Sequence, residues 1–195
     1  MTARKTLRRL AAVALLALAS AGCAATIGQP QASLSGIQAV RQQDLPPIAL
    51  GTFGPGGSVS ASDDRATTVR AINTLAAPGG TFSGYLKTTI ESDLRAAGRL
   101  DPNAPVVLEG LLTRREIVSS VGTGRAALAA HFTLRRDARV LLEKDIAVDA
   151  TWDSSFLGAV AIPDAINNFT GLFERLSVKL LTDPDVKSAL DAHAR

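Results

Sequence analysis

The sequence predicts an α+β fold, a two-layer sandwich in which a mostly antiparallel sheet carries two main helices on one face. Three consecutive segments between residues 106 and 152 alternate apolar and polar side chains, which is typical of strands with one buried and one solvated face. Two longer segments, residues 81–98 and 162–182, repeat apolar side chains every three or four positions, as amphipathic helices do.

The expected strands are separated by residues that favour turns. Pro47–Phe53 is the first strand, because it is largely apolar and a Gly-Pro-Gly-Gly run follows it. Gly122–Gly124 predicts the turn between the first two alternating strands, and Arg136–Ala138 predicts a hairpin before the third. The stretch 58–77 stays open, since Thr67–Ile72 fits either a strand or one turn of helix.

The two expected helices have recognisable ends and apolar stripes. The first begins at Thr81 and ends at Gly98, a residue type that often follows a helix. In the second, Pro163 fits the first turn and Asp164 suits the positive end of the helix dipole. The residues expected to face the sheet include Phe82, Leu86, Ile90 and Leu94 in the first helix and Ile166, Phe169, Phe173 and Leu176 in the second.

Residues 1–22 have the composition of a signal peptide. Four basic residues near the start precede an uncharged run of Leu, Ala and Val, Leu10–Ala19. That run is shorter than the roughly 20 residues needed to cross a bilayer. A cleaved signal is therefore favoured over a transmembrane anchor.

Ser20-Ala21-Gly22-Cys23 resembles the lipobox of bacterial lipoprotein precursors, although Ser20 stands where leucine is commoner. The resemblance implies cleavage by signal peptidase II before Cys23 and attachment of lipid to its thiol. The alternative is an ordinary signal cut after Ala17–Ala19, which would leave Cys23 as a free thiol. Cys23 is the only cysteine, and a lone free thiol is unusual in an exported protein, so the lipoprotein is favoured. Ala24 in place of aspartate after the cysteine implies the outer membrane by the same resemblance.

The mature chain is expected to have two parts. Residues 23–46 are rich in Ala, Gln, Ser and Gly and predict a flexible tether, and residues 47–195 predict a single periplasmic domain. Removing the four basic residues of the signal from the 21 in the full chain leaves 17 against 18 acidic residues, a formal charge of −1. The basic character belongs to the precursor, so it does not indicate nucleic-acid binding.

The sequence shows no familiar catalytic or metal-binding pattern. It lacks a Gly-x-Ser-x-Gly motif, and the two histidines, His131 and His193, are expected to be exposed structural residues. The acidic clusters Asp63-Asp64 and Asp183-Pro184-Asp185 favour a solvated turn and a helix stop over metal ligands. We therefore predict no catalytic residue, no metal site and no cofactor.

Two pairs of arginines leave a binding function open. Arg114-Arg115 and Arg135-Arg136 could lie near each other on neighbouring strands and bind an anionic head group. The alternative, which the composition favours, is a solvated strand edge protected by charge.

The segment from Trp152 to Ile162 is unusually apolar for a connection between elements. It is either buried over the end of the sheet, which the phase of Trp152 favours, or exposed for a partner. If a partner surface exists, it should combine this segment with the neighbouring helix. The candidate residues are Trp152, Phe156, Leu157, Asn167 and Asn168.

The element order of residues 47–183 resembles small envelope lipoproteins, such as the lipopolysaccharide-assembly lipoprotein and the auxiliary lipoproteins of lipid-trafficking ABC transporters. The Trp-x-Ser-Ser-Phe-x-Gly-Ala run at Trp152–Ala159 also resembles a proteobacterial family of uncharacterised lipoproteins. The predicted anchor, the predicted tether and the lack of a familiar catalytic pattern favour a non-enzymatic accessory or binding protein in envelope assembly or lipid traffic, whose partner is an envelope protein complex or a lipid. The alternative is a lipid-anchored periplasmic hydrolase with a site built from scattered residues.

Overall fold

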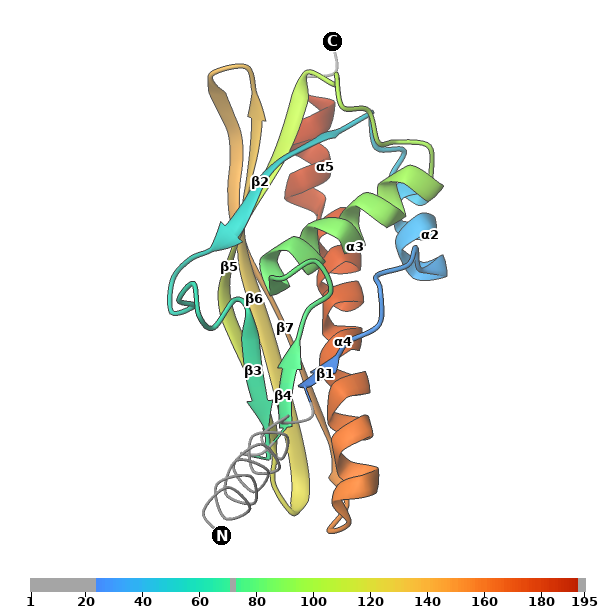
Figure 1. Ribbon diagram of the computed structural model, residues 1–195. Coiled ribbons are helices and arrows are strands. Elements are labelled where there is room, and N and C mark those ends of the chain that lie inside the picture. Colours follow the sequence, from blue (N-terminus) through green and yellow to red (C-terminus); the bar gives the residue numbers. More distant parts are fainter. Residues whose placement is uncertain (1–23, 71–72, 193–195) are drawn as a thin grey trace, which may run out of the picture.

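The computed structural model describes residues 24–70 and 73–192 and has the predicted α+β fold (Figure 1). Within these residues, one sheet of four strands has the order β2-β5-β6-β7. The pair β2/β5 is parallel, and the pairs β5/β6 and β6/β7 are antiparallel. The strands are β2 (Ala49–Pro55), β5 (Val106–Ser119), β6 (Gly122–Arg136) and β7 (Arg139–Ser154).

The helices α3 and α4 cover one face of this sheet, as predicted (Figure 1). Thr81 caps the start of α3, where its side chain accepts a hydrogen bond from the Gly84 amide. The predicted start of α4 is wrong, because the helix begins at Gly158 and Pro163 lies in its second turn. The helices are α2 (Leu34–Gln42), α3 (Phe82–Ala96), α4 (Gly158–Leu181) and α5 (Pro184–Asp191).

A second, smaller sheet lies in the stretch that the sequence left open. Its strands are β1 (Ala24–Thr26), β3 (Ala66–Val69) and β4 (Asn73–Ala76), in the order β1-β4-β3. The strand alternative is thus correct for residues 66–69. Because β1 pairs in parallel with β4, the first described residues are part of the folded body.

The prediction of a flexible tether over residues 23–46 is wrong for the described part of that segment. Ile27, Val40 and Leu45 are at most 3% exposed, and Ser33 caps α2 by accepting a hydrogen bond from the Gly36 amide. The buried side of α2 is formed by Gly36, Ala39 and Val40. Small residues give no strong apolar pattern in the sequence, yet they let a helix approach its neighbours closely.

The core between the sheet and the helices contains a cluster of aromatic rings. Phe82 and Tyr85 from α3 meet Phe169 and Phe173 from α4, with ring centroids 4.8 to 6.3 Å apart. Phe173 and Leu176 are fully buried, which confirms the face predicted for this helix. This cluster fixes α3 and α4 to each other as well as to the sheet.

Two details of the large sheet differ from the expected alternation. The β5/β6 turn lies at residues 120–121, so the prediction of a turn at Gly122–Gly124 is wrong and these residues belong to β6. The predicted β6/β7 hairpin is present, and Asp137 in its turn has a φ of 52°. A bulge at Thr113 shifts the register between β5 and β6. Leu112 and Arg115 therefore both face the helices, which places a guanidinium in the apolar layer.

Candidate functional site

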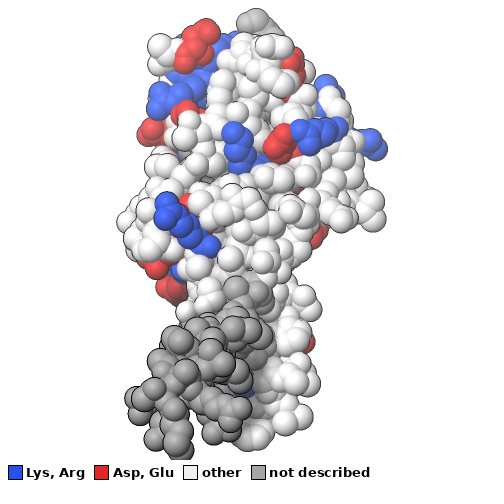
Figure 2. All heavy atoms as spheres, in the orientation of Figure 1, with Lys and Arg blue, Asp and Glu red and all other residues white. Residues whose placement is uncertain are grey.

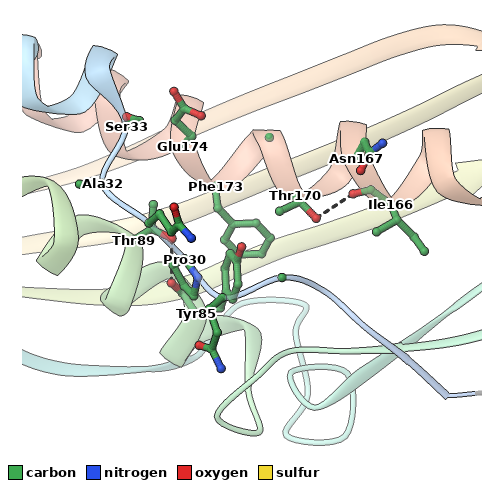
Figure 3. Close-up of a pocket in the computed structure, with 14 residues that line it drawn as sticks. Pro30, Ala32, Ser33, Tyr85, Thr89, Ile166, Asn167, Thr170, Phe173 and Glu174 are labelled. Carbon is green, nitrogen blue, oxygen red and sulfur yellow. Dashed lines mark hydrogen bonds between the residues drawn. The ribbon is translucent and has the colours of Figure 1, made fainter.

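A cavity of about 470 Å³ lies between the segment Gly28–Ser33, α3 and α4 (Figure 3). Pockets that hold small molecules or side chains of a partner have volumes of roughly 300–1,000 Å³, so this one is large enough to bind a ligand. Its walls combine apolar and polar groups. They include Tyr85, Thr89, Ile166, Asn167, Phe173 and Glu174.

The floor of the cavity is rigid. The rings of Tyr85 and Phe173 pack edge to face with centroids 4.8 Å apart, and both residues are buried. The Thr89 hydroxyl donates a hydrogen bond of 2.9 Å to the Tyr85 carbonyl. Burial raises the pKa of the Tyr85 phenol above its ordinary value, so this group stays protonated.

The rim of the cavity is polar and joins the N-terminal segment to α4. The Ser35 hydroxyl donates a hydrogen bond of 2.5 Å to the exposed carboxylate of Glu174. The Thr170 hydroxyl donates one of 2.7 Å to the Ile166 carbonyl, so it is turned back onto its own helix (Figure 3). Asn167 on the rim is exposed, and its side-chain amide offers both a donor and an acceptor.

Asp93 links the three elements that enclose the cavity. Its carboxylate is fully buried and accepts hydrogen bonds from the Ser33 amide at 2.9 Å and the Ser177 hydroxyl at 2.8 Å. Burial raises the pKa of the Asp93 carboxyl above its ordinary value, and the hydrogen bonds from Ser33 and Ser177 oppose that shift. Gly36 leaves the space that this carboxylate fills, since a Cβ there would lie 2.2–2.3 Å from its atoms.

The predicted partner residues do not form one surface. Phe156 is 78% exposed and Leu157 is 61% exposed, so the favoured interpretation that this connection is buried is wrong for both. Asn167 lies on the cavity rim, ten residues along α4 from Leu157, which is roughly 15 Å of helix. Asn168 is half-buried and donates a hydrogen bond to the Asp164 carbonyl.

Trp152 is half-buried and packs over the backbone of Gly124 on the neighbouring strand, where any Cβ would collide with the indole. Its indole nitrogen is buried and has no hydrogen-bond partner among the residues that the structure describes. The lipidation residue predicted from the sequence, Cys23, lies outside the described residues.

His131 belongs to no recognisable catalytic group among the residues that the structure describes. His131 Nδ1 lies 3.0 Å from the Asp145 carboxylate of the neighbouring strand, on the face of the sheet opposite the helices. Among the described residues, Asp145 is its one hydrogen-bond partner, so no nucleophile is bonded to the ring as a hydrolase triad requires. His193 lies outside the described residues.

The acidic clusters have structural roles. Asp64 is buried and caps α3 by accepting hydrogen bonds from the amide and hydroxyl of Ser83, so the solvated-turn prediction is wrong for it. Asp183 caps α5 and, with Asp185, binds the Lys144 ammonium, which agrees with the predicted helix stop. Within residues 24–70 and 73–192, no group of three or more His, Cys, Asp or Glu side chains could hold a metal ion.

The expectation that the two arginine pairs could lie together is wrong. Arg114 stands opposite Ala129 and Arg135 opposite Val107, so the pairs are six positions apart along β6, roughly 20 Å. Arg114 forms an ion pair with Glu116, and Arg135 forms one with Glu109. Arg115 is buried instead, with its guanidinium carbon 5.1 Å from the centre of the Phe82 ring.

Models of known protein families and curated proteins give no match to this chain. The structure is similar to protein XCC0632 from Xanthomonas campestris, of the family DUF330, with a TM-score of 0.55 and 13% identity over 86% of this chain and 94% of that protein. It also matches a minor lipoprotein from Acinetobacter baumannii, with a TM-score of 0.46 and 13% identity over 74% of this chain and 93% of the other.

At these identities the similarity to XCC0632 shows a shared fold alone, and the weaker match adds no argument. The fold is therefore an α+β sandwich of that kind, with a cavity under its N-terminal segment. In the part of the chain that the structure describes, no helix has the length and hydropathy of a membrane span.

Proposed function

We propose that this chain is a lipid-anchored, non-enzymatic accessory or binding protein of the bacterial cell envelope, held by Cys23 at the periplasmic face of the outer membrane. One observation carries the proposal. The residues directly after Cys23 enter β1, and the chain continues from there into the wall of the cavity. A lipid on Cys23 would therefore hold the folded body, with its cavity, close to a membrane surface.

The cavity under the segment Gly28–Ser33 is the proposed binding site. Apolar rings form its floor, and Asn167 and Glu174 on its rim offer hydrogen-bonding groups. This mixture suits an amphipathic ligand, such as a lipid or a peptide segment of an envelope protein. The hydrolase alternative has no comparable support, because His131 is bonded to Asp145 and to no nucleophile in the described residues.

The anchor is tested by Cys23→Ser in the full-length precursor. We expect the variant to lose palmitate labelling and to escape cleavage by signal peptidase II, since the thiol that takes the lipid is gone. Unchanged labelling of the variant would refute the anchor. Ala24→Asp serves as the companion variant, and it should move the protein from the outer to the inner membrane if the lipobox resemblance holds.

The binding role is tested by a pull-down from intact cells with the anchored protein. Gly171 lines the cavity, and a Cβ built there meets no atom within 4 Å, so Gly171→Leu places an apolar side chain in the cavity. We expect it to lose the captured partner or lipid, whereas Thr182→Leu, at the exposed residue that follows the same helix, keeps it. Equal capture by both variants would refute the cavity as the site, and turnover of an ester or amide substrate by purified protein would favour the hydrolase.

A further inference from the structure

Four exposed apolar residues lie together at one end of the molecule. They are Val121, Phe156, Leu157 and Val160, with exposed fractions of 64%, 78%, 61% and 47%, and we refer to them as the apolar tip. Val121 belongs to the β5/β6 turn, and the other three belong to the connection into α4 and its first turn. Figure 1 shows both segments at the lower end of the body.

The surroundings of the apolar tip are nearly free of charge. The segments Ile117–Gly124 and Ser154–Pro163 contain no charged residue, and Arg125 and Asp153 flank them in the sequence. On the part of the surface that Figure 2 leaves visible, most charged side chains lie on the upper part of the molecule. Contiguous exposed apolar side chains of this kind usually mark a surface that contacts a membrane or another molecule.

Arg70 holds the apolar tip against the small sheet. From the β3/β4 turn, its guanidinium donates hydrogen bonds to the carbonyls of Ser119, Ser155 and Phe156 at 3.2, 2.5 and 3.2 Å. The Ser119 and Ser154 hydroxyls lie 3.1 Å apart, which joins the ends of β5 and β7. Arg70 therefore ties the β5/β6 turn and the connection into α4 to the small sheet, and it satisfies the carbonyl of Phe156.

The chain enters the described body at this same end. Ala24 stands opposite Thr74, and Thr74 stands opposite Thr68, which is two residues from Arg70. Cys23 precedes Ala24 directly, so its Cα lies about 3.8 Å from that of Ala24. A lipid on Cys23 would thus begin beside the turn that Arg70 ties to the apolar tip.

We infer that the apolar tip rests in the lipid interface beside the acyl chains on Cys23 and sets the orientation of the body on the membrane. The inference rests on the proposed lipid anchor, which brings a bilayer to this end of the molecule. Aromatic and aliphatic side chains favour the boundary between head groups and acyl chains, and a second contact strengthens attachment by lipid. In this orientation the β6/β7 turn and α5 point away from the membrane (Figure 1).

The test uses the full-length lipidated protein in vesicles of phosphatidylethanolamine and phosphatidylglycerol, with and without brominated phosphatidylcholine. The single native tryptophan is removed by Trp152→Phe, and a reporter is introduced by Phe156→Trp. The matched control is Val140→Trp, at a residue that is 40% exposed at the start of β7, beside the β6/β7 turn. We expect the brominated lipid to remove most of the emission of the reporter at position 156 and to leave that at position 140 unchanged.

Equal quenching at the two positions, or quenching at neither in protein that stays with the vesicles, would overturn the inference and leave the anchor intact. A reporter at position 156 that is shielded from acrylamide but not quenched by the lipid would indicate a protein contact and would also overturn it. Protein that does not stay with the vesicles would refute the proposed anchor itself, and the inference with it.

Discussion

Gly36→Ala should loosen the N-terminal segment from the rest of the body. In the folded protein, a Cβ at position 36 would lie 2.2–2.3 Å from three atoms of the Asp93 carboxylate, a separation that no real contact reaches. Either α2 must move away from α3, or Asp93 must move and give up its hydrogen bonds to Ser33 and Ser177. Both responses weaken the packing of residues 24–46.

The size of the effect follows from opposing contributions. Forcing an extra methyl group into a packed interior costs ~1–3 kcal/mol. Hydrogen bonds lost by a buried polar group cost about 1–3 kcal/mol more. Alanine is better than glycine inside a helix by roughly 1 kcal/mol, which offsets part of this. We expect a net loss of about 1–5 kcal/mol in the free energy of unfolding.

Urea denaturation followed by circular dichroism measures this loss, and Gly171→Ala is the control. Gly171 also lies inside a helix, but a Cβ there meets no atom within 4 Å, so that change should stabilise the protein by roughly 0.5–1 kcal/mol. The loss caused by Gly36→Ala should shrink in an Asp93→Ala background, where the space is free. If Gly36→Ala stabilises the protein as Gly171→Ala does, residues 24–46 are not packed against α3 and the tether prediction was correct.

Two further predictions concern stability. Burial raises the pKa of the Asp93 carboxyl above its ordinary value of 3.8, so its contribution to stability is full below that value and is lost as the pH rises through the folded-state pKa. Asp93→Asn should therefore flatten the fall in melting temperature as the pH rises above about 4, and an unchanged pH profile would contradict this assignment. Phe173→Ala should lower the free energy of unfolding by ~3–5 kcal/mol because the ring is fully buried. Phe156→Asp should change it by at most about 0.5 kcal/mol because that ring is exposed. Similar melting temperatures for the two variants would contradict the burial described.

The large sheet and its two covering helices could be predicted because they carry strong periodic patterns. Leu108, Phe132 and Ile146 alternate with polar residues on strands that are covered on one side, and this is the pattern that a single buried face imposes. The bulge at Thr113 could not be predicted, since one extra residue in a strand leaves no local mark. Arg115 faces the core for that reason, against the alternation read from the sequence.

The cavity could not be predicted, because its walls come from three segments that are far apart in the chain. One signal was present in the sequence. Asp93 lies on the apolar stripe of α3, three residues after Ile90 and one before Leu94, and a carboxylate in that position requires buried hydrogen-bond donors. The exposure of Phe156 was misread because an apolar connection usually packs inward, and only the three-dimensional arrangement shows that nothing in the described body covers it.

If Cys23 carries the proposed lipid, the same N-terminal segment sets the distance of the cavity from the membrane. A flexible tether of 24 residues would let the domain move several nanometres from the lipid, so the cavity could face the periplasm at any height. Because β1 begins at Ala24 and the wall begins at Gly28, four residues separate Cys23 from the cavity wall, and the five steps between the two Cα atoms span at most roughly 18 Å. The nearest wall of the cavity would therefore lie at most roughly 18 Å from the lipid-bearing residue. This geometry suits a ligand that arrives from the membrane surface better than one that diffuses in the periplasm.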